Sequence, residues 1–380
     1  MLWQSVDKRA KQCCETLWKA GFDAYPVGGC VRDLLLGRTP GDWDVTTNAL
    51  PEQVMAAFDH TVPTGIQHGT ITVLIEGTAV EVTTFRTEGG YSDGRHPDGV
   101  RFDATLEQDL SRRDFTINAM ALARDGSVID PFGGQADLKS HTIRCVGEPD
   151  RRFGEDALRM FRAVRFGAQL GFTVEEDTYN ALGRNAGKVK YLAGERVRVE
   201  VEKTLCSPCP AEVKTLFDLG LMVGWSDAVP AETGWLAKLP KEPVLRWAGL
   251  CACLQPEDVE GVLRGLKLDG ATIRACSAGY NLWRAGVPIR DRDWRLALIQ
   301  FGVDGCRACA AMAGELEPLE AELAQNPCIR AEQLALSGGE LVKLGLFGPE
   351  IGQMQQRLLA FVAEHPEANT RERLLAEIKK

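Results

Sequence analysis

The spacing of apolar residues changes along the chain, from mixed helical and strand periods in the first third to helical spacing alone afterwards. Apolar positions three and four apart predict early helices at 4–20, 30–36 and 51–58. Runs rich in β-branched and aromatic residues predict strands at 42–46, 70–75 and 79–85, the last two forming a hairpin. The predicted fold class is therefore α+β, with a mixed sheet first and helices alone in the rest.

One helical pattern is stronger than the others. Residues 154–166 have an apolar stripe on one side, made by Ala157, Met160, Phe161 and Val164. Charged residues step by three along the other side, at Asp156, Arg159, Arg162 and Arg165. We also expect Asp114 to be the N-cap of a helix over 115–122. Ordinary amphipathic helices are predicted further on, at 210–219, 246–254 and 257–266.

The composition is that of a globular protein. The chain has 380 residues, 44% hydrophobic and 26% charged, which suits two or three domains. Its net charge of −9 argues against a broad nucleic-acid-binding surface, although residues 151–203 are basic. The start of the chain lacks the features of a secretory signal, and no run of about 18 apolar residues suggests a membrane span. We therefore expect a cytoplasmic protein without membrane contact.

Twelve cysteines are scattered along the chain, and in the cytoplasm they should be mostly reduced thiols. Two C-x-x-C pairs, Cys206 with Cys209 and Cys306 with Cys309, could together give a structural zinc ion four thiolates. Their wide separation in sequence is unlike a compact zinc module. Ordinary buried thiols are the expectation.

The candidate chemistry begins at Gly28-Gly29, where missing side chains let a phosphate approach backbone N–H groups at a helix start. Arg32, on that short helix, adds a further contact for an anion. Asp42 and Asp44 are two apart in the expected strand, so both carboxylates project from one side and can share Mg²⁺. With a third carboxylate they could hold two ions, which would activate an attacking oxygen and steady a leaving phosphate.

Three further features accompany this pair. Glu81, in the second hairpin strand, is the candidate third carboxylate, and Asp114 is the alternative. Residues 86–101 are polar and glycine-rich, and a loop of this length in a compact domain indicates a lid or a binding element. Arg112 and Arg113 are adjacent at an expected helix entrance, which suits a polyanion.

Together these motifs resemble the class II nucleotidyltransferase superfamily, which contains the tRNA CCA-adding enzymes and the bacterial poly(A) polymerases. The resemblance rests on Gly-Gly-x-Val-Arg-Asp, Asp-x-Asp, Arg-Arg-Asp and Glu-Asp-x-x-Arg, which begin at residues 28, 42, 112 and 155. Two weaker matches lie at 130–138 and 194–200. The motifs cover the first half of the chain specifically, whereas the second half corresponds by position only.

The resemblance implies a nucleotidyltransferase head at 1–140, then an all-helical neck at 141–205, body at 206–320 and tail at 321–380. It implies that phosphates contact Gly29, Arg32, Arg113, Arg162 and Arg165, and that Mg²⁺ is bound by Asp42 and Asp44. Glu195 or Glu200 is expected to orient Arg159 or to cap a helix. The body and tail are expected to grip the acceptor and T arms of tRNA.

In the family, the Glu-Asp-x-x-Arg motif selects the nucleotide, which assigns this role to Asp156 and Arg159. Cytosine and adenine each present an amino donor beside a ring-nitrogen acceptor, so a carboxylate and a guanidinium can read both. Uracil and guanine reverse this pattern and would leave a charge badly paired. The implied reaction is template-independent addition of C, C and A to tRNA 3′ ends from CTP and ATP.

Several alternatives stay open at this point. A bacterial poly(A) polymerase would share the head and neck motifs, although the mixed charges of residues 340–380 favour tRNA. An enzyme that adds only CC or only A is also open, and the intact loop at 86–101 argues against CC alone. A catalytically inactive RNA-binding protein is disfavoured by the acidic pair. The sequence leaves the oligomeric state open.

Overall fold

The computed structural model describes residues 2–89, 99–226, 228–285 and 294–380. The chain divides into two compact units, each described by itself below. The first unit contains residues 1–204 and 215–227, and the second contains 205–214 and 228–380. The expected division into head, neck, body and tail stays a prediction. The centre of the expected loop, residues 90–98, lies outside the described residues.

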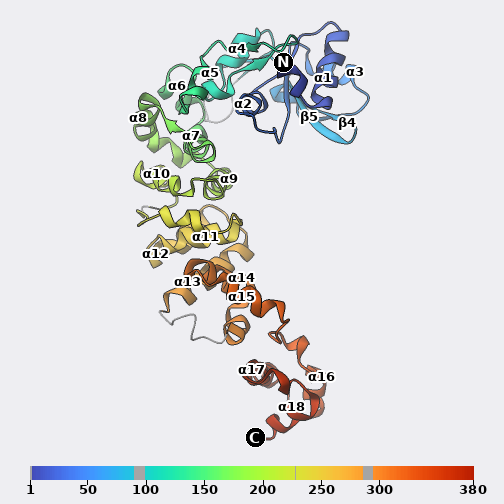
Figure 1. The fold of residues 1–380 in the computed structure, drawn as a ribbon, viewed down its shortest axis with the longest axis vertical. Coiled ribbons are helices and arrows are strands. Elements are labelled where there is room, and N and C mark those ends of the chain that lie inside the picture. The colour runs from blue at the N-terminus through green and yellow to red at the C-terminus, as the bar shows by residue number, and fades with distance from the viewer. Residues whose placement is uncertain (1, 90–98, 227, 286–293) are drawn as a thin grey trace. The chain divides into compact units, whose positions relative to one another are not determined.

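The first unit begins with a five-stranded sheet of order β1-β2-β5-β4-β3. β2 and β5 are parallel and the other neighbours are antiparallel, so the sheet is mixed as predicted. Helices α1 and α3 pack on it (Figure 1), and buried Leu17, Val45, Val54 and Ile71 share one core. The elements are α1 Lys8–Lys19, β1 Ala24–Pro26, β2 Asp44–Thr47, α3 Pro51–Ala57, β3 Thr61–Gly65, β4 Thr70–Ile75 and β5 Thr78–Thr84.

Between β1 and β2 the chain forms the short helix α2, Gly29–Leu35, as the pattern predicts. Gly37, with a φ of 68°, ends it. β2 begins only at Asp44, two residues later than expected, because its ladders start at Asp44 and Val45. Asp42 consequently lies in the preceding turn rather than in the strand.

The expected helix at 115–122 is wrong. The segment contains a 3-10 turn, Thr116–Asn118, followed by strand β8, Ala121–Leu122. Bridges from Phe115 to Cys145 and from Ala121 to Val27 draw the chain into an extended path, so Asp114 caps no α-helix. The neighbouring elements are β6 Thr87–Glu88, β7 Val100–Arg101, α4 Leu106–Ser111, β9 Val128–Ile129, α5 Gly134–Lys139 and β10 Thr142–Ile143.

The strong helical pattern at 154–166 is interrupted. It forms the end of α6, Pro149–Glu155, and the start of α7, Leu158–Leu170, with Asp156 extended between them at φ −143° and ψ 108°. The Asp156 carboxylate accepts the N–H of Leu158 at 2.9 Å, which starts α7. The predicted apolar stripe is buried. The unit continues through β11 Thr173–Val174, α8 Glu176–Asn185, α9 Gly194–Leu205 and α10 Val213–Asp218.

The second unit is helical throughout its described residues. Among its described residues, one core cluster lies around Leu298, Cys306 and Leu319, and another lies around Leu341 and Leu358. Prolines at the first helical positions start two of the predicted helices slightly early. The α-helices are α11 Pro243–Ala252, α12 Pro256–Gly265, α13 Gly270–Arg284, α14 Trp294–Ala313, α15 Leu316–Ala324, α16 Gly338–Lys343, α17 Pro349–Glu364 and α18 Arg371–Ile378. The expected helix at 210–219 is a 3-10 turn followed by α10.

By length and hydropathy alone, α14 is the one helix among the described residues that could cross a membrane. Gly302 breaks its helical backbone with φ 73° and ψ 167°. Further along, a Cβ on Gly305 would lie 2.8 Å from the Cβ of Ala278 on α13, which shows how closely the two helices pack. α14 therefore has the surroundings of a core helix.

The cysteines of the described chain are all free thiols. No group of three or more His, Cys, Asp or Glu side chains placed to hold a metal occurs among the described residues. The four-thiolate zinc set considered from the C-x-x-C pairs therefore gains no support.

Candidate active site

A polar cavity of about 480 Å³ lies in the first unit, where α2, the start of β2 and α7 meet. Its walls contain both arginine and aspartate side chains. The lining residues include Gly28, Gly29, Arg32, Asp33, Asp42, Asp44, Arg112, Arg113, Asp114, Asn118, Asp156, Arg159, Arg162, Phe166 and Arg196. The cavity thus gathers residues from both the expected head and the expected neck.

Asp42 and Asp44 both line this cavity, Asp42 from the turn and Asp44 from the first position of β2. Burial, together with the nearby carboxylates of Glu81 and Asp42, raises the pKa of Asp44 to about 6 against the opposing effect of Arg113. A divalent cation beside these oxygens would favour the ionised form. Glu81 pairs with Asp44 in register across β2 and β5, but its side chain is exposed and does not line the cavity.

Gly28 and Gly29, at the start of α2, line the same cavity. Gly28 has a φ of 81°, and a Cβ there would lie only 2.9 Å from Nη1 of Arg113. Its N–H already donates to the Met120 carbonyl at 3.1 Å, so Gly28 contributes space rather than a donor. Arg32 contacts the carboxylate of Asp33 at 2.8 Å and donates to Oδ1 of Asn118 at 2.7 Å. The side chain of Arg32 is therefore held in place within the cavity wall.

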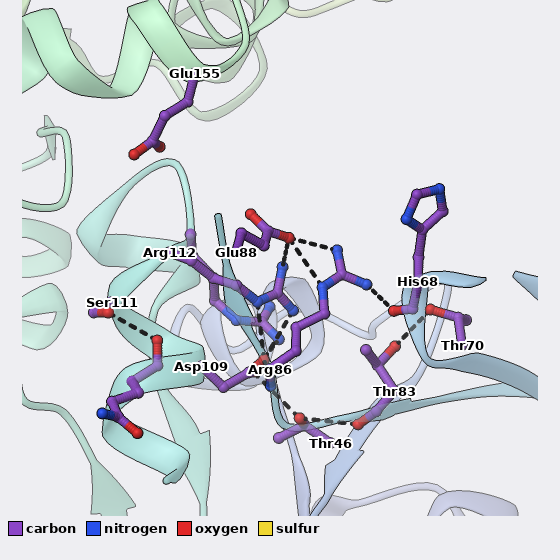
Figure 2. A network of polar contacts seen from close by, with 12 residues as sticks. Thr46, His68, Thr70, Thr83, Arg86, Glu88, Asp109, Ser111, Arg112 and Glu155 are labelled. Atoms are coloured by element: carbon purple, nitrogen blue, oxygen red, sulfur yellow. Dashed lines mark hydrogen bonds and ion pairs between the residues drawn. The ribbon is translucent and has the colours of Figure 1, made fainter. Parts of the chain in front are cut away.

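Arg112 and Arg113 share a buried anion behind the cavity. Asp109, on α4, has a fully buried side chain and accepts from Arg112 Nη2 at 2.8 Å and Arg113 Nη2 at 3.5 Å. The hydroxyl of Thr46 on β2 donates to the same carboxylate at 3.3 Å (Figure 2). Asp109 thereby links α4 to β2 and holds both guanidinium groups. The Nε of Arg113 is buried without a hydrogen-bond partner.

The two expected base-reading residues are both in the cavity, and each has its own partner. Arg196 of α9 donates to Asp156 at 3.0 Å, and its Nη1 is buried without a partner. Arg159 donates from Nη1 to Glu155 at 2.6 Å and from Nη2 to the Arg112 carbonyl at 3.0 Å. Glu155 therefore orients Arg159, the role expected of Glu195 or Glu200.

Arg162 and Arg165 differ in their surroundings. Arg162 lines the cavity and contacts Asp114 at 2.6 Å. Burial alone would raise the pKa of Asp114, but the charges of Arg162 and Arg159 and its hydrogen bonds hold it at about 2. Arg165 does not line the cavity, because its guanidinium contacts Glu200 at 2.5 Å and lies 4.0 Å from the centre of the Phe166 ring.

The cavity unites eight of the ten expected site residues: Gly29, Arg32, Asp42, Asp44, Arg113, Asp156, Arg159 and Arg162. Glu81 and Arg165 lie outside its walls. Sequence reasoning missed Asp33, Asn118, Phe166 and Arg196 as lining residues. Asp33 and Arg196 lie inside quoted motifs, so the motifs carried a signal, whereas Asn118 and Phe166 depend on how separate segments meet.

Six arginines line the cavity, and each has a carboxylate partner in the first unit. The pairs are Arg32 with Asp33, Arg112 with Asp109 and Glu88, Arg113 with Asp109, Arg159 with Glu155, Arg162 with Asp114, and Arg196 with Asp156. The arginine side chains are therefore positioned before any ligand is bound. Such a set can bind a triphosphate and a base edge beside a carboxylate pair suited to a divalent cation.

Comparison with known proteins agrees with this chemistry. The family described as "Poly A polymerase head domain" matches residues 24–144, and "Probable RNA and SrmB- binding site of polymerase A" matches 171–225. A CCA-adding enzyme of Geobacillus kaustophilus is 39% identical, over 95% of this chain and 93% of its own. One of Limosilactobacillus fermentum is 38% identical, over 96% of this chain and 95% of its own.

A solved structure is also similar. The Bacillus stearothermophilus CCA-adding enzyme in complex with CTP superposes with a TM-score of 0.81 at 35% identity, covering 94% of this chain and 92% of that one. The predicted α+β class with a helical remainder is thus confirmed. Full-length similarity at this identity, together with the motifs gathered in one cavity, shows that the chain belongs to the family of CCA-adding enzymes.

Proposed function

We propose that this protein adds C, C and A to the 3′ end of tRNA without a nucleic-acid template, using CTP and ATP. The observation that carries the proposal is the single cavity that contains the acidic pair, the arginines and the Asp156/Arg159 pair. The relatives that match over nearly their whole length are CCA-adding enzymes. A poly(A) polymerase is not favoured. Because these substrates are intracellular, we place the reaction in the cytoplasm.

Within this proposal, Asp42 and Asp44 bind Mg²⁺. The residues fit the ion, because two carboxylates share one cavity and carboxylate oxygens are its preferred protein ligands. When bound, Mg²⁺ would neutralise charge on the triphosphate and lower the pKa of the primer hydroxyl. Arg32, Arg113 and Arg162 contact the phosphates, with Gly29 giving them room. Glu81 as third carboxylate and Arg165 as phosphate contact have less support, since neither lines the cavity.

Nucleotide choice rests on Asp156 and Arg159. Asp156 accepts from the amino group that cytosine and adenine share, and Arg159 donates to the adjacent ring nitrogen. Arg196 and Glu155 hold the two side chains. A carbonyl oxygen facing Asp156 would leave its charge unpaired, so UTP and GTP are rejected. The helical second unit supplies the surface for the acceptor and T arms of tRNA.

The test is incorporation by purified protein of labelled CTP and ATP into tRNA that lacks its 3′ end. We expect products longer by three nucleotides, loss of activity with excess EDTA, and recovery on adding Mg²⁺. Products that stop at CC, or addition of A only to CC-ended tRNA, would indicate a divided-labour enzyme. Long A tails on unrelated RNA would indicate a poly(A) polymerase. Absence of incorporation with Mg²⁺ present would overturn the proposal.

A further inference from the structure

Glu88 does not line the cavity, yet it contacts a residue that does. It lies at the end of β6, with a side chain only 7% exposed. Its Oε1 accepts from Nε and Nη2 of Arg86, at 2.9 and 2.7 Å, and from Nη1 of Arg112 at 3.1 Å (Figure 2). One carboxylate oxygen therefore bridges two arginines from different segments.

The Glu88 carboxylate offsets the positive charges of Arg86 and Arg112. Burial lowers the pKa of Arg86, the nearby charge of Arg112 lowers it further, and Glu88 acts in the opposite direction. Arg86 is anchored on its other side by the His68 carbonyl, and its backbone N–H donates to Asp109 at 3.3 Å. Without the charge of Glu88, two buried like charges would face each other, and the repulsion would displace Arg112.

Arg112 also contacts Arg159, one of the two residues expected to read the base. Its side chain is held by Glu88 on one side and by Asp109 on the other. Its backbone carbonyl accepts from Nη2 of Arg159 at 3.0 Å. The other terminal nitrogen, Nη1, donates to Glu155 at 2.6 Å and to the Arg152 carbonyl at 3.2 Å. The Arg112 carbonyl is therefore one of the groups that set the direction of the Arg159 guanidinium, and it is the one that accepts from Nη2.

We propose that Glu88 is a positioning residue for nucleotide selection. By balancing Arg86 and Arg112, it holds the Arg112 carbonyl where Arg159 must donate, and so keeps the Arg159 guanidinium aimed at the base. The inference rests on the proposed function and deepens it. It extends nucleotide selection from residues of the cavity wall to the segment 86–88, which does not line the cavity.

The competing explanation is that Glu88 only stabilises the fold, since β6 pairs with β7 and its side chain reaches the C-cap residue of α4. The two roles differ in one measurable quantity. A purely structural defect lowers kcat/KM for every nucleotide by a similar factor. A misdirected Arg159 lowers the selectivity ratios, namely kcat/KM for CTP over UTP and for ATP over GTP.

The experiment compares Glu88→Gln with wild type on tRNA lacking its 3′ end, using all four nucleotides separately. We expect both selectivity ratios to fall about tenfold, with the thermal unfolding midpoint measured alongside. The matched control is Asp137→Asn. Asp137 is a comparably buried carboxylate of the same unit that contacts Arg144 and Thr116 and does not line the cavity. The Asp137→Asn variant should lower stability and leave both selectivity ratios at wild-type values.

A second variant tests the charge balance directly. Adding Arg86→Gln to Glu88→Gln removes the unbalanced cation and leaves Arg112 with Asp109, so the ratios should recover towards wild type. If Glu88→Gln does not fold, Glu88→Asp keeps the charge with a shorter reach and should lower the ratios about threefold.

Unchanged ratios in Glu88→Gln, or in Glu88→Asp where the first variant does not fold, would overturn the inference while leaving the proposed function intact. A double variant as unselective as Glu88→Gln would likewise overturn it. Failure of the wild-type protein to incorporate CTP and ATP would instead overturn the proposed function. The two failures are therefore distinguishable within one assay.

Discussion

At Gly28 the backbone has φ 81° and ψ −130°, a region that is essentially restricted to glycine. We expect Gly28→Ala to lower the free energy of unfolding by about 1–3 kcal/mol and to displace Arg113, whose Nη1 would meet the new Cβ. KM should rise for CTP and ATP together, because phosphate contacts are common to both. The measurements are thermal unfolding and steady-state kinetics.

Gly37→Ala is the matched control, since φ is also positive there and nothing lies within 4 Å of the added Cβ. It should lower stability by a similar amount without changing KM. An equal change in KM in both variants would mean that backbone strain, not Arg113, is responsible.

The acidic pair gives the second prediction. Asp42→Asn and Asp44→Asn should each reduce incorporation by at least about a hundredfold, because each removes a metal ligand, while thermal stability and tRNA affinity stay close to wild type. Asp125→Asn, in the turn between β8 and β9, is outside the cavity and should keep full activity. More than about a tenth of wild-type rate in either cavity variant would contradict the metal assignment.

Asp114 gives a prediction about pH. Its folded pKa is about 2, below the ordinary value of 3.8. A lowered folded pKa stabilises the protein fully above about pH 4, and this stabilisation is lost as pH falls through 2. Asp114→Asn should therefore lower the free energy of unfolding by about 2 kcal/mol at pH 7, and the difference should shrink below pH 4. Urea unfolding of both proteins at pH 7 and at pH 2 measures this. If the difference in the free energy of unfolding is as large at pH 2 as at pH 7, the prediction is wrong.

At the scale of residues, local motifs predicted most of the site. Gly29, Asp42, Asp44 and Arg113 could be assigned because each motif places its chemistry within a few residues. Contacts between segments that are distant in sequence could not be predicted from local motifs. Asp114 was interpreted as a cap because the sequence does not show that α7 brings Arg162 within 2.6 Å of it.

At the scale of elements, the break between α6 and α7 changes how the reading pair can be tested. Exchanging Asp156 and Arg159 would place an arginine beside Arg196 and a carboxylate beside Glu155. These like charges would destabilise the site, so a neutral replacement is better. Asp156→Asn can donate as well as accept, and we expect it to admit UTP and GTP and lower the selectivity ratios by at least about tenfold.

Asp150→Asn serves as control for this variant, because Asp150 lies on α6 but outside the cavity and contacts Arg184. Its selectivity should equal that of wild type. Lower stability with unchanged selectivity in Asp156→Asn would mean that Asp156 acts only as the residue that starts α7.

The elements themselves were predictable where the periodic pattern was long or where proline and glycine marked the ends. β4, β5, α3, α11 and α12 lie within a few residues of their expected bounds. The failures at 115–122 and 154–166 share one cause, because partners distant in sequence override local preference there. The bridges of Phe115 and Ala121 replaced a helix with extended chain, and the Asp156 contacts with Leu158 and Arg196 accompany the break in another.

At the scale of the whole molecule, the boundary between the units matters for any shortened chain. Residues 205–214 belong to the second unit, but 215–227 return to the first, where the Trp225 ring lies 6.2 Å from that of buried Phe161. We expect residues 1–227 to fold and bind CTP. A chain ending at 205, the expected end of the neck, should unfold at least about 5 °C lower, because it loses buried Leu216, Leu221 and Met222. Equal melting temperatures would contradict this.

Because the arginines of the cavity are already paired with carboxylates, a nucleotide that binds there replaces carboxylates as the arginines' partners. Each phosphate that approaches Arg32, Arg113 or Arg162 competes with a carboxylate already in contact. The number of ion pairs changes little on binding, so affinity for CTP should depend on salt more weakly than the arginine count suggests. A protein with a net charge of −9 can in this way hold a nucleoside triphosphate at one site.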